Sequence, residues 1–381
     1  MNDATKAQDL NSPLVKYALQ GLERCWLPQS GCWSAIYHLD GRDDPNESIP
    51  SSDVFYTLNV LLGFARVSHI PHGIDLADTF HRNVSRVIAV PVPTYAYGMA
   101  LWTAAELDLP VPEQVLPHIK SILADRKRWR AFRAQDLGML LTGVVAQARR
   151  DSKIWSATAD ALFAFLIERY HSASGLFFDA AYGMRRRFGS FATQTYLTLA
   201  CYAYGEFANN PNAIEMANLA VRKLIKLQGP NGEWPWFFHV PSATVVDFYE
   251  IYSVHQYGMA PAFLERSERH GVAEARGALI KGFRWVLGEN QLRRSMLVPE
   301  LHLSIRSQVR KGELHTKALR IGRAISNGLL RRASGLVDPA HVELRRECRS
   351  YELGWILWSF GRRADLPELT EHRMFADPMP A

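Results

Sequence analysis

Apolar residues along this chain recur at spacings of three and four, in one segment after another. This spacing places them on one face of an α-helix, whereas the two-residue alternation of a half-buried strand is rare. Capping residues, prolines and glycines mark where each periodic segment begins and ends. The pattern predicts helices over residues 12–26, 51–62, 75–90, 94–102, 112–125, 134–149, 153–171, 191–207, 212–228, 252–266, 273–287 and 350–360.

The predicted helices pair into six hairpins, and the second helices share a register in their first turns. The glycine-containing examples are Tyr95-Ala96-Tyr97-Gly98-Met99, Gln135-Asp136-Leu137-Gly138-Met139, His255-Gln256-Tyr257-Gly258-Met259 and Tyr351-Glu352-Leu353-Gly354-Trp355. Glycine allows another helix backbone to approach closely. Six repeated hairpins predict an all-α fold, an (α/α)6 toroid whose inner ring is formed by the second helices. An open helical solenoid is the alternative.

Residues 12–365 are predicted to form a single toroid domain, with residues 1–11 and 366–381 as flexible tails. Residues 289–349 interrupt the pattern before the last inner helix, and they hold 13 Lys and Arg against 6 Asp and Glu. We expect helices over residues 303–309 and 314–330 in this basic helical insertion. It could act as a lid over the mouth of the toroid, as a surface for a partner, or as an amphipathic contact with anionic lipid.

Composition narrows the class of protein. No run of eighteen apolar residues occurs, which argues against a membrane span, and residues 1–12 carry no secretory signal, so we expect a cytoplasmic protein. The four cysteines are scattered, without a C-x-x-C pair or a histidine at ligand spacing. We therefore expect neither a metal site nor a cofactor. Because the net charge of +6 is concentrated in the insertion, nucleic acid is not an expected partner.

A Gly/Pro/Asn turn with two tryptophans lies at the tip of the fifth hairpin, over residues 228–238. Its Gln228-x-x-x-Gly232-x-Trp234 resembles the QW motif of terpenoid cyclases, and residues 228–237 resemble the Q-x-P-N-G-x-W-P-x-F tip of helical-toroid pectate lyases. Such tips are structural in these families, so the resemblance implies a toroid of the kind found in polysaccharide lyases, epimerases and glycosidases without selecting a chemistry. The paired aspartates that follow the tip in those lyases are replaced here by Val254-His255-Gln256.

Polar residues in the shared register point to a common site. In a toroid the first turns of the inner helices converge on one mouth, where their side chains share a cavity. The residues placed there are Asp53, Tyr95, Gln135, Asp136, Gln194, His255, Gln256, Tyr351 and Glu352. Helix capping accounts for Asp53, but it does not require tyrosine, histidine or glutamine. The substrate-binding candidates are Tyr95, Gln135, Gln194 and Gln256.

His255 and its neighbouring tyrosines are candidates for proton transfer. A neutral imidazole exchanges a proton near pH 7, and a tyrosine hydroxyl can donate one. With Tyr252 or Tyr351, His255 could remove a proton next to a sugar carboxylate and return one to a leaving oxygen or to the opposite face. That is the chemistry of a lyase or an epimerase, and simple packing is the alternative role of these rings.

Carboxylates allow a different reaction. If two of Asp53, Asp136 and Glu352 faced each other at the mouth, they would form the general acid and base of a glycosidase. Each could instead cap a helix or pair with a cation.

Aromatic and basic residues complete the predicted site. Trp234 and Trp236 in the tip suit stacking on sugar faces. Three groups of arginines lie just before inner helices, where a guanidinium could hold a carboxylate or a phosphate: Arg185, Arg186 and Arg187; Arg130 and Arg133; and Arg345, Arg346 and Arg349.

These features predict a carbohydrate-active enzyme for an acidic or anion-linked glycan. It would work by proton transfer of the lyase or epimerase type, or by carboxylate-assisted hydrolysis of a glycosidic bond. One alternative is an isoprenoid-handling relative of cyclases and prenyltransferases, which would need an aromatic and largely uncharged cavity. Another is a non-catalytic glycan-binding or scaffold protein, whose register residues would pack against one another without an open mouth.

Overall fold

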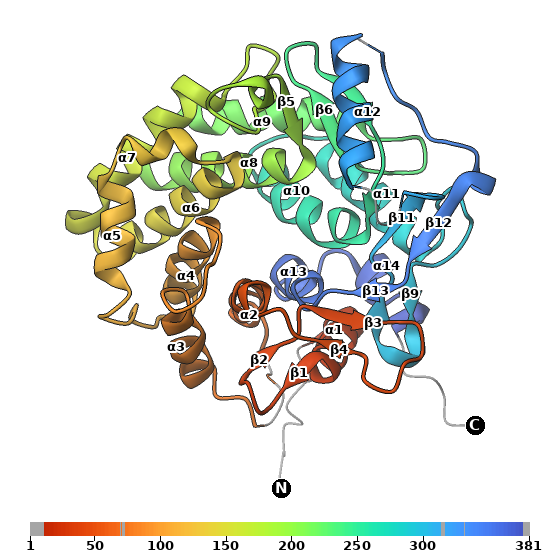
Figure 1. Cartoon of the computed structure of the whole chain (residues 1–381), viewed down its shortest axis with the longest axis horizontal. Coiled ribbons are helices and arrows are strands. Elements are labelled where there is room, and N and C mark those ends of the chain that lie inside the picture. The colour runs from red at the N-terminus through yellow and green to blue at the C-terminus, as the bar shows by residue number, and fades with distance from the viewer. Residues whose placement is uncertain (1–10, 69, 71–72, 314–316, 331, 376–381) are drawn as a thin grey trace, which may run out of the picture.

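The computed structural model describes residues 11–68, 70, 73–313, 317–330 and 332–375, and a helix lies at the position of each of the twelve helices predicted for the six hairpins (Figure 1). The first helices of the pairs are α1 (Pro13–Cys25), α3 (Leu76–Arg86), α5 (Leu116–Ala124), α7 (Ser152–Tyr170), α9 (Pro211–Leu227) and α11 (Ala275–Leu287). The second helices are α2 (Pro50–Phe64), α4 (Tyr95–Glu106), α6 (Ala134–Arg150), α8 (Phe191–Ala208), α10 (Ala260–Arg269) and α13 (Ser350–Phe360). A π-helical turn, η3 (His255–Met259), leads directly into α10.

The second helices form an inner ring, and the first helices surround it (Figure 1). Going round the ring, α2 packs against α4, α4 against α6, α6 against α8, α8 against α10, and α10 against α13. The last inner helix, α13, also packs against α2. The fold is therefore an (α/α)6 toroid and not an open solenoid.

The glycines of the shared register hold neighbouring inner helices close together. A Cβ added to Gly98 would lie 2.4 Å from backbone atoms of α6, and one added to Gly138 would lie 2.9 Å from the backbone of α8. A Cβ on Gly258 would lie 2.6 Å from a side chain of α13, and one on Gly354 would lie 2.9 Å from the backbone of α2. Each of these four glycines thus faces the next helix of the ring, at a distance that admits no side chain.

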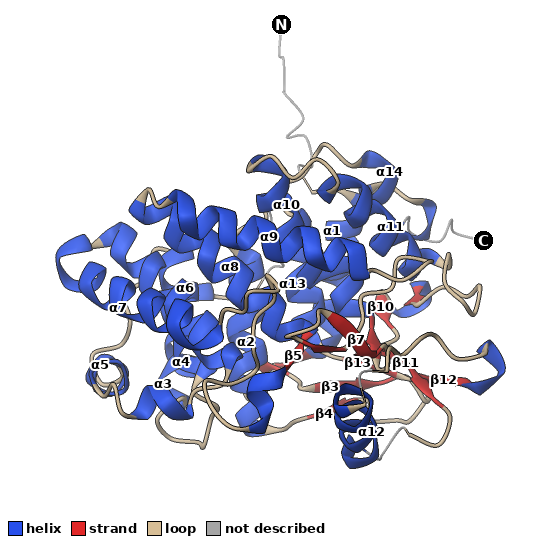
Figure 2. Ribbon diagram, turned by 90° about the horizontal axis from the view of Figure 1, so that it is seen from above, coloured by secondary structure: helices blue, strands red, loops and turns tan. Residues whose placement is uncertain are grey.

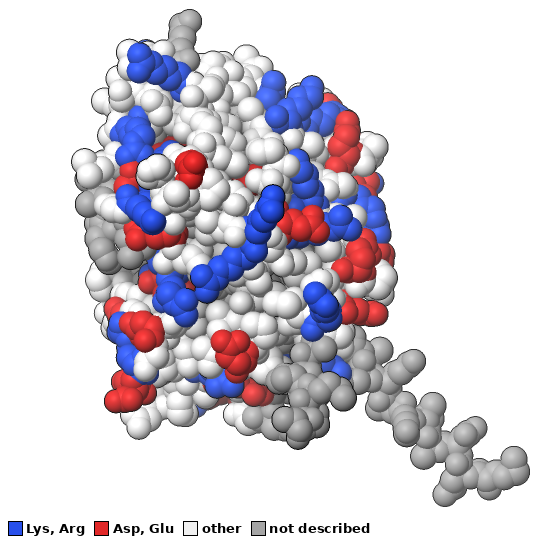
Figure 3. All heavy atoms as spheres, turned by 90° about the vertical axis from the view of Figure 1, so that its right-hand side faces the viewer, with Lys and Arg blue, Asp and Glu red and all other residues white. Residues whose placement is uncertain are grey.

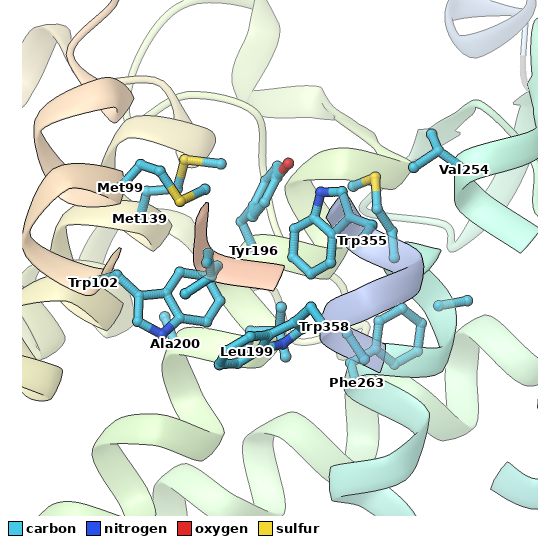
Figure 4. Close-up of a cluster of buried hydrophobic side chains, with 14 of the residues drawn as sticks. Met99, Trp102, Met139, Tyr196, Leu199, Ala200, Val254, Phe263, Trp355 and Trp358 are labelled. Carbon is cyan, nitrogen blue, oxygen red and sulfur yellow. The ribbon is translucent and has the colours of Figure 1, made fainter. Parts of the chain in front are cut away.

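Large apolar side chains fill the ring below its mouth (Figure 4). They come from all sides of the ring and include Met99, Trp102, Met139, Tyr196, Phe263, Trp355 and Trp358. The rings of Trp102 and Trp358 meet edge to face with their centroids 5.1 Å apart. The centre of the toroid is therefore a packed core, and only its mouth is open to a ligand.

Small antiparallel sheets gather at one side of the ring (Figure 2). Their strands are β1 (Trp26–Leu27), β2 (Cys32–Trp33), β3 (Ile36–His38), β4 (Asn46–Glu47), β5 (Phe188–Ser190), β6 (Phe237–His239), β7 (Thr244–Asp247), β8 (Ile251–Tyr252), β9 (Leu297–Val298), β10 (Leu303–Ser304), β11 (Ser307–Arg310), β12 (Val342–Arg345) and β13 (Glu347–Cys348). β5 pairs with β6 and β6 with β7, so the turn before α8 is joined to the tip of the fifth hairpin.

The insertion over residues 289–349 is only partly helical. The helix predicted over 314–330 is confirmed by α12 (Lys317–Leu329), although residues 314–316 lie outside the described part. The helix predicted over 303–309 is wrong, because this stretch forms β10 and β11. β11 pairs with β8 on one side and β12 on the other. A short strand with neighbours on both sides does not show a clear two-residue alternation of apolar and polar residues, and periodicity alone does not distinguish it from a helix.

Arginines of the insertion pair with fully buried carboxylates of the ring. The pairs are Arg306–Glu352 (2.9 Å), Arg310–Asp247 (2.7 Å) and Arg345–Glu250 (3.3 Å). A buried carboxylate requires such a partner, so part of the positive charge of the insertion neutralises the ring. Figure 3 views the molecule from the side of β11 and β12, and basic and acidic residues are interspersed there.

The end of the described chain packs onto the toroid instead of forming a tail. Residues 367–375 contain α14 (Pro367–Thr370) and the short turn η6 (Arg373–Phe375). Leu366, Leu369 and Phe375 are buried, and the ring of Phe375 lies 5.3 Å from that of Tyr17 in α1. The prediction of a flexible tail over 366–375 is therefore wrong, because these apolar side chains cover the outer helices. Residues 1–10 and 376–381, also predicted as tails, lie outside the described residues.

Candidate functional site

A cavity of about 370 Å³ opens where the first turns of the inner helices meet. Five inner helices, α2, α4, α6, α8 and α13, contribute to it, together with η3, β5, β6, β8, α12 and the turn η2 (Met184–Arg187). From the inner helices and η3 come Phe55, Tyr56, Tyr95, Gln135, Ala192, Thr193, Tyr196, His255, Met259 and Tyr351. Polar and aromatic side chains thus surround an open space at the mouth predicted from the register.

The glycine register determines which residues reach this cavity. Tyr95, Gln135, His255 and Tyr351 all line it, and each lies three residues before a register glycine. Residues three apart share one side of a helix. The glycine fits against the next inner helix, and the residue one turn earlier therefore reaches the common mouth.

Two glutamines of the register do not reach the cavity. The amide of Gln194 donates to the carbonyl of Phe177 (2.7 Å) and accepts from its N–H (2.9 Å). The amide of Gln256, oriented to satisfy both of its atoms, donates to the carbonyl of Gly232 (3.0 Å) and accepts from the N–H of Trp234 (3.2 Å). Both glutamines are fully buried and hold the turns of neighbouring hairpins, which corrects their expected place at the substrate.

The two tryptophans of the tip lie in different environments. Trp234 is fully buried, and the centre of its ring lies 5.5 Å from that of Phe191 and 6.2 Å from that of Phe263. It therefore packs inside the protein instead of facing a ligand. Trp236 does line the cavity. Only the second of the two is placed where it could contact a ligand.

Two predicted carboxylates are used within the fold. Asp53 is fully buried and accepts a hydrogen bond from the hydroxyl of Ser48 (2.5 Å). Asp136 accepts from the N–H groups of Tyr95 (2.9 Å) and Arg133 (2.8 Å), which caps α6 and ties it to α4. Neither belongs to the cavity lining, so they do not form a pair of catalytic carboxylates across the mouth.

Glu352, the third predicted carboxylate, lies behind the cavity and holds an arginine that the sequence analysis missed. Arg306 contacts Glu352 at 2.9 Å and Glu347 at 3.3 Å, and its guanidinium lies 5.1 Å from the ring centre of Tyr252. Tyr257 donates its hydroxyl proton to Glu352 (3.1 Å). Burial raises the pKa of Glu352, and Arg306 opposes that rise. Arg306 itself lines the cavity.

The position of Arg306 explains why it was overlooked. It lies between β10 and β11, in the stretch that periodicity assigns to a helix. An arginine within a mostly buried run was nevertheless a usable signal, because a buried charge needs specific partners.

His255 is buried, with 5% of its surface exposed, at the wall of the cavity. Its ring lies 4.5 Å from that of Phe191 and 5.0 Å from that of Tyr252. Nδ1 is enclosed and has no hydrogen-bond partner among the described residues. Burial, with a smaller contribution from Arg306, lowers the pKa of His255 to about 3, so its imidazole is neutral.

Tyr252 lies beside His255, and Tyr56, Tyr95 and Tyr351 line the same cavity. Tyr252 donates its hydroxyl proton to Glu250 (3.0 Å), and the rings of Tyr351 and Tyr56 lie 4.6 Å apart. Burial raises the pKa of Tyr351 and raises that of Tyr95 to about 12. These phenols therefore hold their protons near neutral pH and can serve as donors.

Among the arginines predicted to hold an anion, Arg133 and Arg185 line the cavity, whereas Arg187 and Arg349 do not. Arg187 is exposed and outside the lining, and Arg349 is paired with Glu347 (2.8 Å). Arg185, in the same turn as Arg187, and Arg133, just before α6, do line the cavity. Which residue of a short basic run points inward depends on the turn η2, which the sequence pattern does not define.

Asp179 is the one carboxylate among the described lining residues. It accepts hydrogen bonds from the N–H of Ser190 (2.8 Å) and from the hydroxyl of Thr193. Burial raises its pKa. The sequence analysis did not identify it, because it lies in the turn between α7 and α8 and not in the helical register.

Solved structures with this ring include several enzymes of carbohydrate metabolism. A possible member of the GH105 family from Klebsiella pneumoniae superposes with a TM-score of 0.58 and 12% identity, over 95% of this chain and 94% of its own. An unsaturated glucuronyl hydrolase from Bacillus sp. GL1 superposes with a TM-score of 0.57 and 11% identity, over 94% of this chain and 96% of its own. A sugar epimerase from a ruminal bacterium superposes with a TM-score of 0.52 and 9% identity, over 72% of this chain and 86% of its own.

The chain shares their fold. No protein-family model matches its sequence, and no curated protein matches it either. At these low identities the likeness concerns the arrangement of helices, and the chemistry has to be argued from the cavity.

The cavity combines a buried neutral histidine, several protonated tyrosines and three arginines against one carboxylate. Within the described ranges, no group of three metal-ligating side chains occurs. The same residues include no helix that is both long and apolar enough to cross a lipid bilayer. The arrangement is suited to binding an anion and to moving a proton beside it.

Proposed function

We propose that this chain is a carbohydrate-active enzyme that binds a uronate-type sugar in its cavity and transfers a proton next to the sugar carboxylate. The observation that carries the proposal is the grouping of Arg306, Tyr252 and His255 at one wall. The ring of Tyr252 lies 5.0 Å from that of His255 and 5.1 Å from the guanidinium of Arg306. Tyr252 thus contacts both an anion-binding group and a proton-transfer group at this wall of the cavity.

The fold supports a carbohydrate substrate. One structural neighbour is named as an unsaturated glucuronyl hydrolase responsible for the degradation of glycosaminoglycan, and another as a sugar epimerase. The excess of arginine over carboxylate in the lining argues for an acidic sugar and against the uncharged cavity that an isoprenoid would need. The open cavity itself argues against a purely structural role for the register residues.

The proposed reaction begins with the sugar carboxylate next to Arg306. A bound carboxylate favours the charged form of a neighbouring imidazole, so binding would raise the low pKa of His255. With Nδ1 enclosed, Nε2 is the nitrogen that a substrate can meet, and it takes the proton from the carbon beside the carboxylate. The C–H electron pair moves toward the carboxylate, and Arg306 stabilises the developing negative charge. In elimination this pair forms a double bond to the neighbouring carbon as that carbon's bond to oxygen breaks, and Tyr351 gives its proton to the departing oxygen. In epimerisation the pair instead takes the proton of Tyr351 on the opposite face of the same carbon. His255 then releases its proton to water, and Tyr351 takes one back.

Hydrolysis assisted by Asp179 is the second candidate. Its buried carboxyl has a raised pKa, which suits a general acid that protonates a leaving oxygen. The usual glycosidase arrangement requires a pair of carboxylates, and the described lining residues do not include such a pair. Hydrolysis is therefore less well supported than proton transfer.

Isotope exchange separates the two reactions. Glucuronate-terminated disaccharides, saturated and unsaturated, would be incubated with the protein in D₂O and followed by proton NMR. Proton transfer predicts loss of the signal of the hydrogen beside the carboxylate of the saturated disaccharides, and His255→Gln should lower the rate about 100-fold or more. His341→Gln, at an exposed position outside the lining, is the matched control and should leave the rate unchanged.

Hydrolysis would release the sugar without that exchange, and Asp179→Asn would abolish the release while His255→Gln would not. That result would replace the first candidate with the second. An absence of both exchange and release, together with an absence of binding to any uronate, would overturn the proposal.

A further inference from the structure

A second hydrophobic cluster, separate from the core of the ring, lies beside the cavity. Its buried members are Phe188, Phe237, Val246 and Ala324, and Trp236 and Ile325 pack against them. Phe188 and Phe237 stack with their ring centres 5.4 Å apart and their planes 9° from parallel. The cluster joins α12 of the insertion to β5, β6 and β7.

Close contacts hold α12 in this place. Asn327 donates to the carbonyl of Val246 (3.1 Å), and Arg323 pairs with Glu313. A Cβ added to Gly328 would lie 2.4 Å from the ring of Phe188. The helix is therefore seated on the sheet and forms part of the cavity wall, as one of the predicted roles of the insertion requires.

The cluster supplies Phe188, Trp236, Phe237 and Ile325 to the cavity lining, and Ile321 of α12 and Met184 of η2 line the cavity as well. Apart from the indole N–H of Trp236, these side chains carry no hydrogen-bonding group. Figure 1 shows α12, β5 and β6 on one side of the ring opening, and α13 and α2, which carry Tyr351 and Tyr56, on the other.

A sugar ring would be poorly accommodated against this apolar part. Sugar hydroxyls pressed against Ile321, Ile325 and Met184 would lose water without gaining a partner, which is unfavourable. An alkyl or aromatic group in the same place would gain from leaving water. The cavity volume of about 370 Å³ is in the range that holds ligands larger than one sugar ring.

We propose that this apolar part, formed by α12, β5, β6 and η2, is a subsite for an aromatic or alkyl group attached to the sugar. The substrate is then an amphipathic uronide, with its acidic sugar at Arg306 and His255 and its apolar aglycone under α12. This inference rests on the proposed function for the sugar half and adds the class of the group linked to it.

Binding of paired ligands to the whole protein tests the subsite. The probes are phenyl and methyl glucuronides of both anomers and phenyl glucosides, with dissociation constants measured by calorimetry. The phenyl glucuronide is expected to bind about tenfold more tightly than the methyl glucuronide, as burial of one ring predicts. Ile321→Ser should bring this ratio close to one, because it weakens the binding of the phenyl compound more than that of the methyl compound.

Two further variants show whether a change in the affinity ratio arises from the subsite or from a loss of fold. Leu329 lies on the same helix and is 58% exposed, so Leu329→Ser is the matched control and should preserve the tenfold ratio. Met184 is 63% exposed at the edge of the cavity, so Met184→Ser should reduce the ratio without disturbing the core.

The outcomes distinguish the inference from the function on which it rests. Equal affinities of the unmodified protein for phenyl and methyl glucuronides would overturn the apolar subsite and leave the proposed function standing. Equal affinities for phenyl glucuronide and phenyl glucoside would overturn the acidic-sugar function and leave the apolar subsite standing. Failure of every one of these ligands to bind would overturn both.

Discussion

Substitution of Gly98 by alanine should test the packing that brings the site together. Gly98 lies in α4, where an added Cβ would be 2.4 Å from backbone atoms of Met139 and Leu140 in α6. The contact is reciprocal, since a Cβ on Gly143 of α6 would lie 2.3 Å from the carbonyl oxygen of Gly98. The neighbour is backbone and has no rotamer to change, so α4 and α6 must move apart to admit the methyl group.

The expected cost follows from two opposing effects. Overpacking a close contact destabilises a protein by about 1–3 kcal/mol, and a contact with rigid backbone belongs at the upper end. Alanine is favoured over glycine in a helix by about 1 kcal/mol. The difference predicts that Gly98→Ala lowers the free energy of unfolding by roughly 2 kcal/mol. Because Tyr95 lies one turn earlier on the same side of α4, the substitution should also weaken ligand binding in the cavity.

Gly277 provides the matched control. It lies in α11, is exposed, and has no atom within 4 Å of the position where its Cβ would be. Gly277→Ala should therefore raise the free energy of unfolding by up to about 1 kcal/mol. Urea unfolding followed by circular dichroism measures both variants. Equal stability of the two variants would refute the argument that register glycines set the spacing of the inner ring.

Three further predictions address particular groups. His255 has a pKa of about 3 in the native protein and 6.5 in the unfolded chain, so the native protein holds it neutral. Between pH 6.5 and pH 3 the unfolded state therefore binds one more proton than the native state, and the free energy of unfolding falls as the pH drops through this range. Between pH 7 and pH 5 the unmodified protein should lose about 2 kcal/mol more than His255→Gln in urea unfolding, and parallel losses would contradict the assigned environment. Gln194→Ala should lower the free energy of unfolding by about 2 kcal/mol, because it leaves both backbone groups of Phe177 unpaired, while an unchanged stability would show that water replaces the amide. Removal of residues 366–375, with three buried apolar side chains, should cost about 4 kcal/mol in the same assay, whereas a neutral effect would support the original prediction of a tail.

The ring was predictable because its causes are local in the sequence. Helical periodicity depends on residues three and four positions apart, and each hairpin repeats the same pattern. The register glycines identified the helices that approach closely, and residues one turn earlier, such as His255 and Tyr351, were correctly placed at one cavity. This part of the site follows from the repeat itself.

Other parts of the site depend on contacts between distant segments. Gln194 and Gln256 belong to the same register as His255, yet their amides are taken up by backbone groups of neighbouring turns. Which polar group faces the ligand and which one holds a turn is decided by the partner that folding brings within 3 Å. The periodic pattern of the sequence does not show which distant group becomes that hydrogen-bonding partner.

The amino-acid sequence by itself determined the helices, their pairing and the four cavity residues of the glycine register, because these depend on spacing within single helices. Tertiary structure alone decided that Arg306 reaches the mouth, that Arg185 and not Arg187 lines the cavity, and that α12 covers an apolar part of the cavity. The first placement comes from β11 pairing between β8 and β12, the second from the turn η2, and the third from α12 seating on β6 and β7. The reason is physical: a strand in the middle of a sheet and a helix seated on one acquire their orientation from segments far away along the chain.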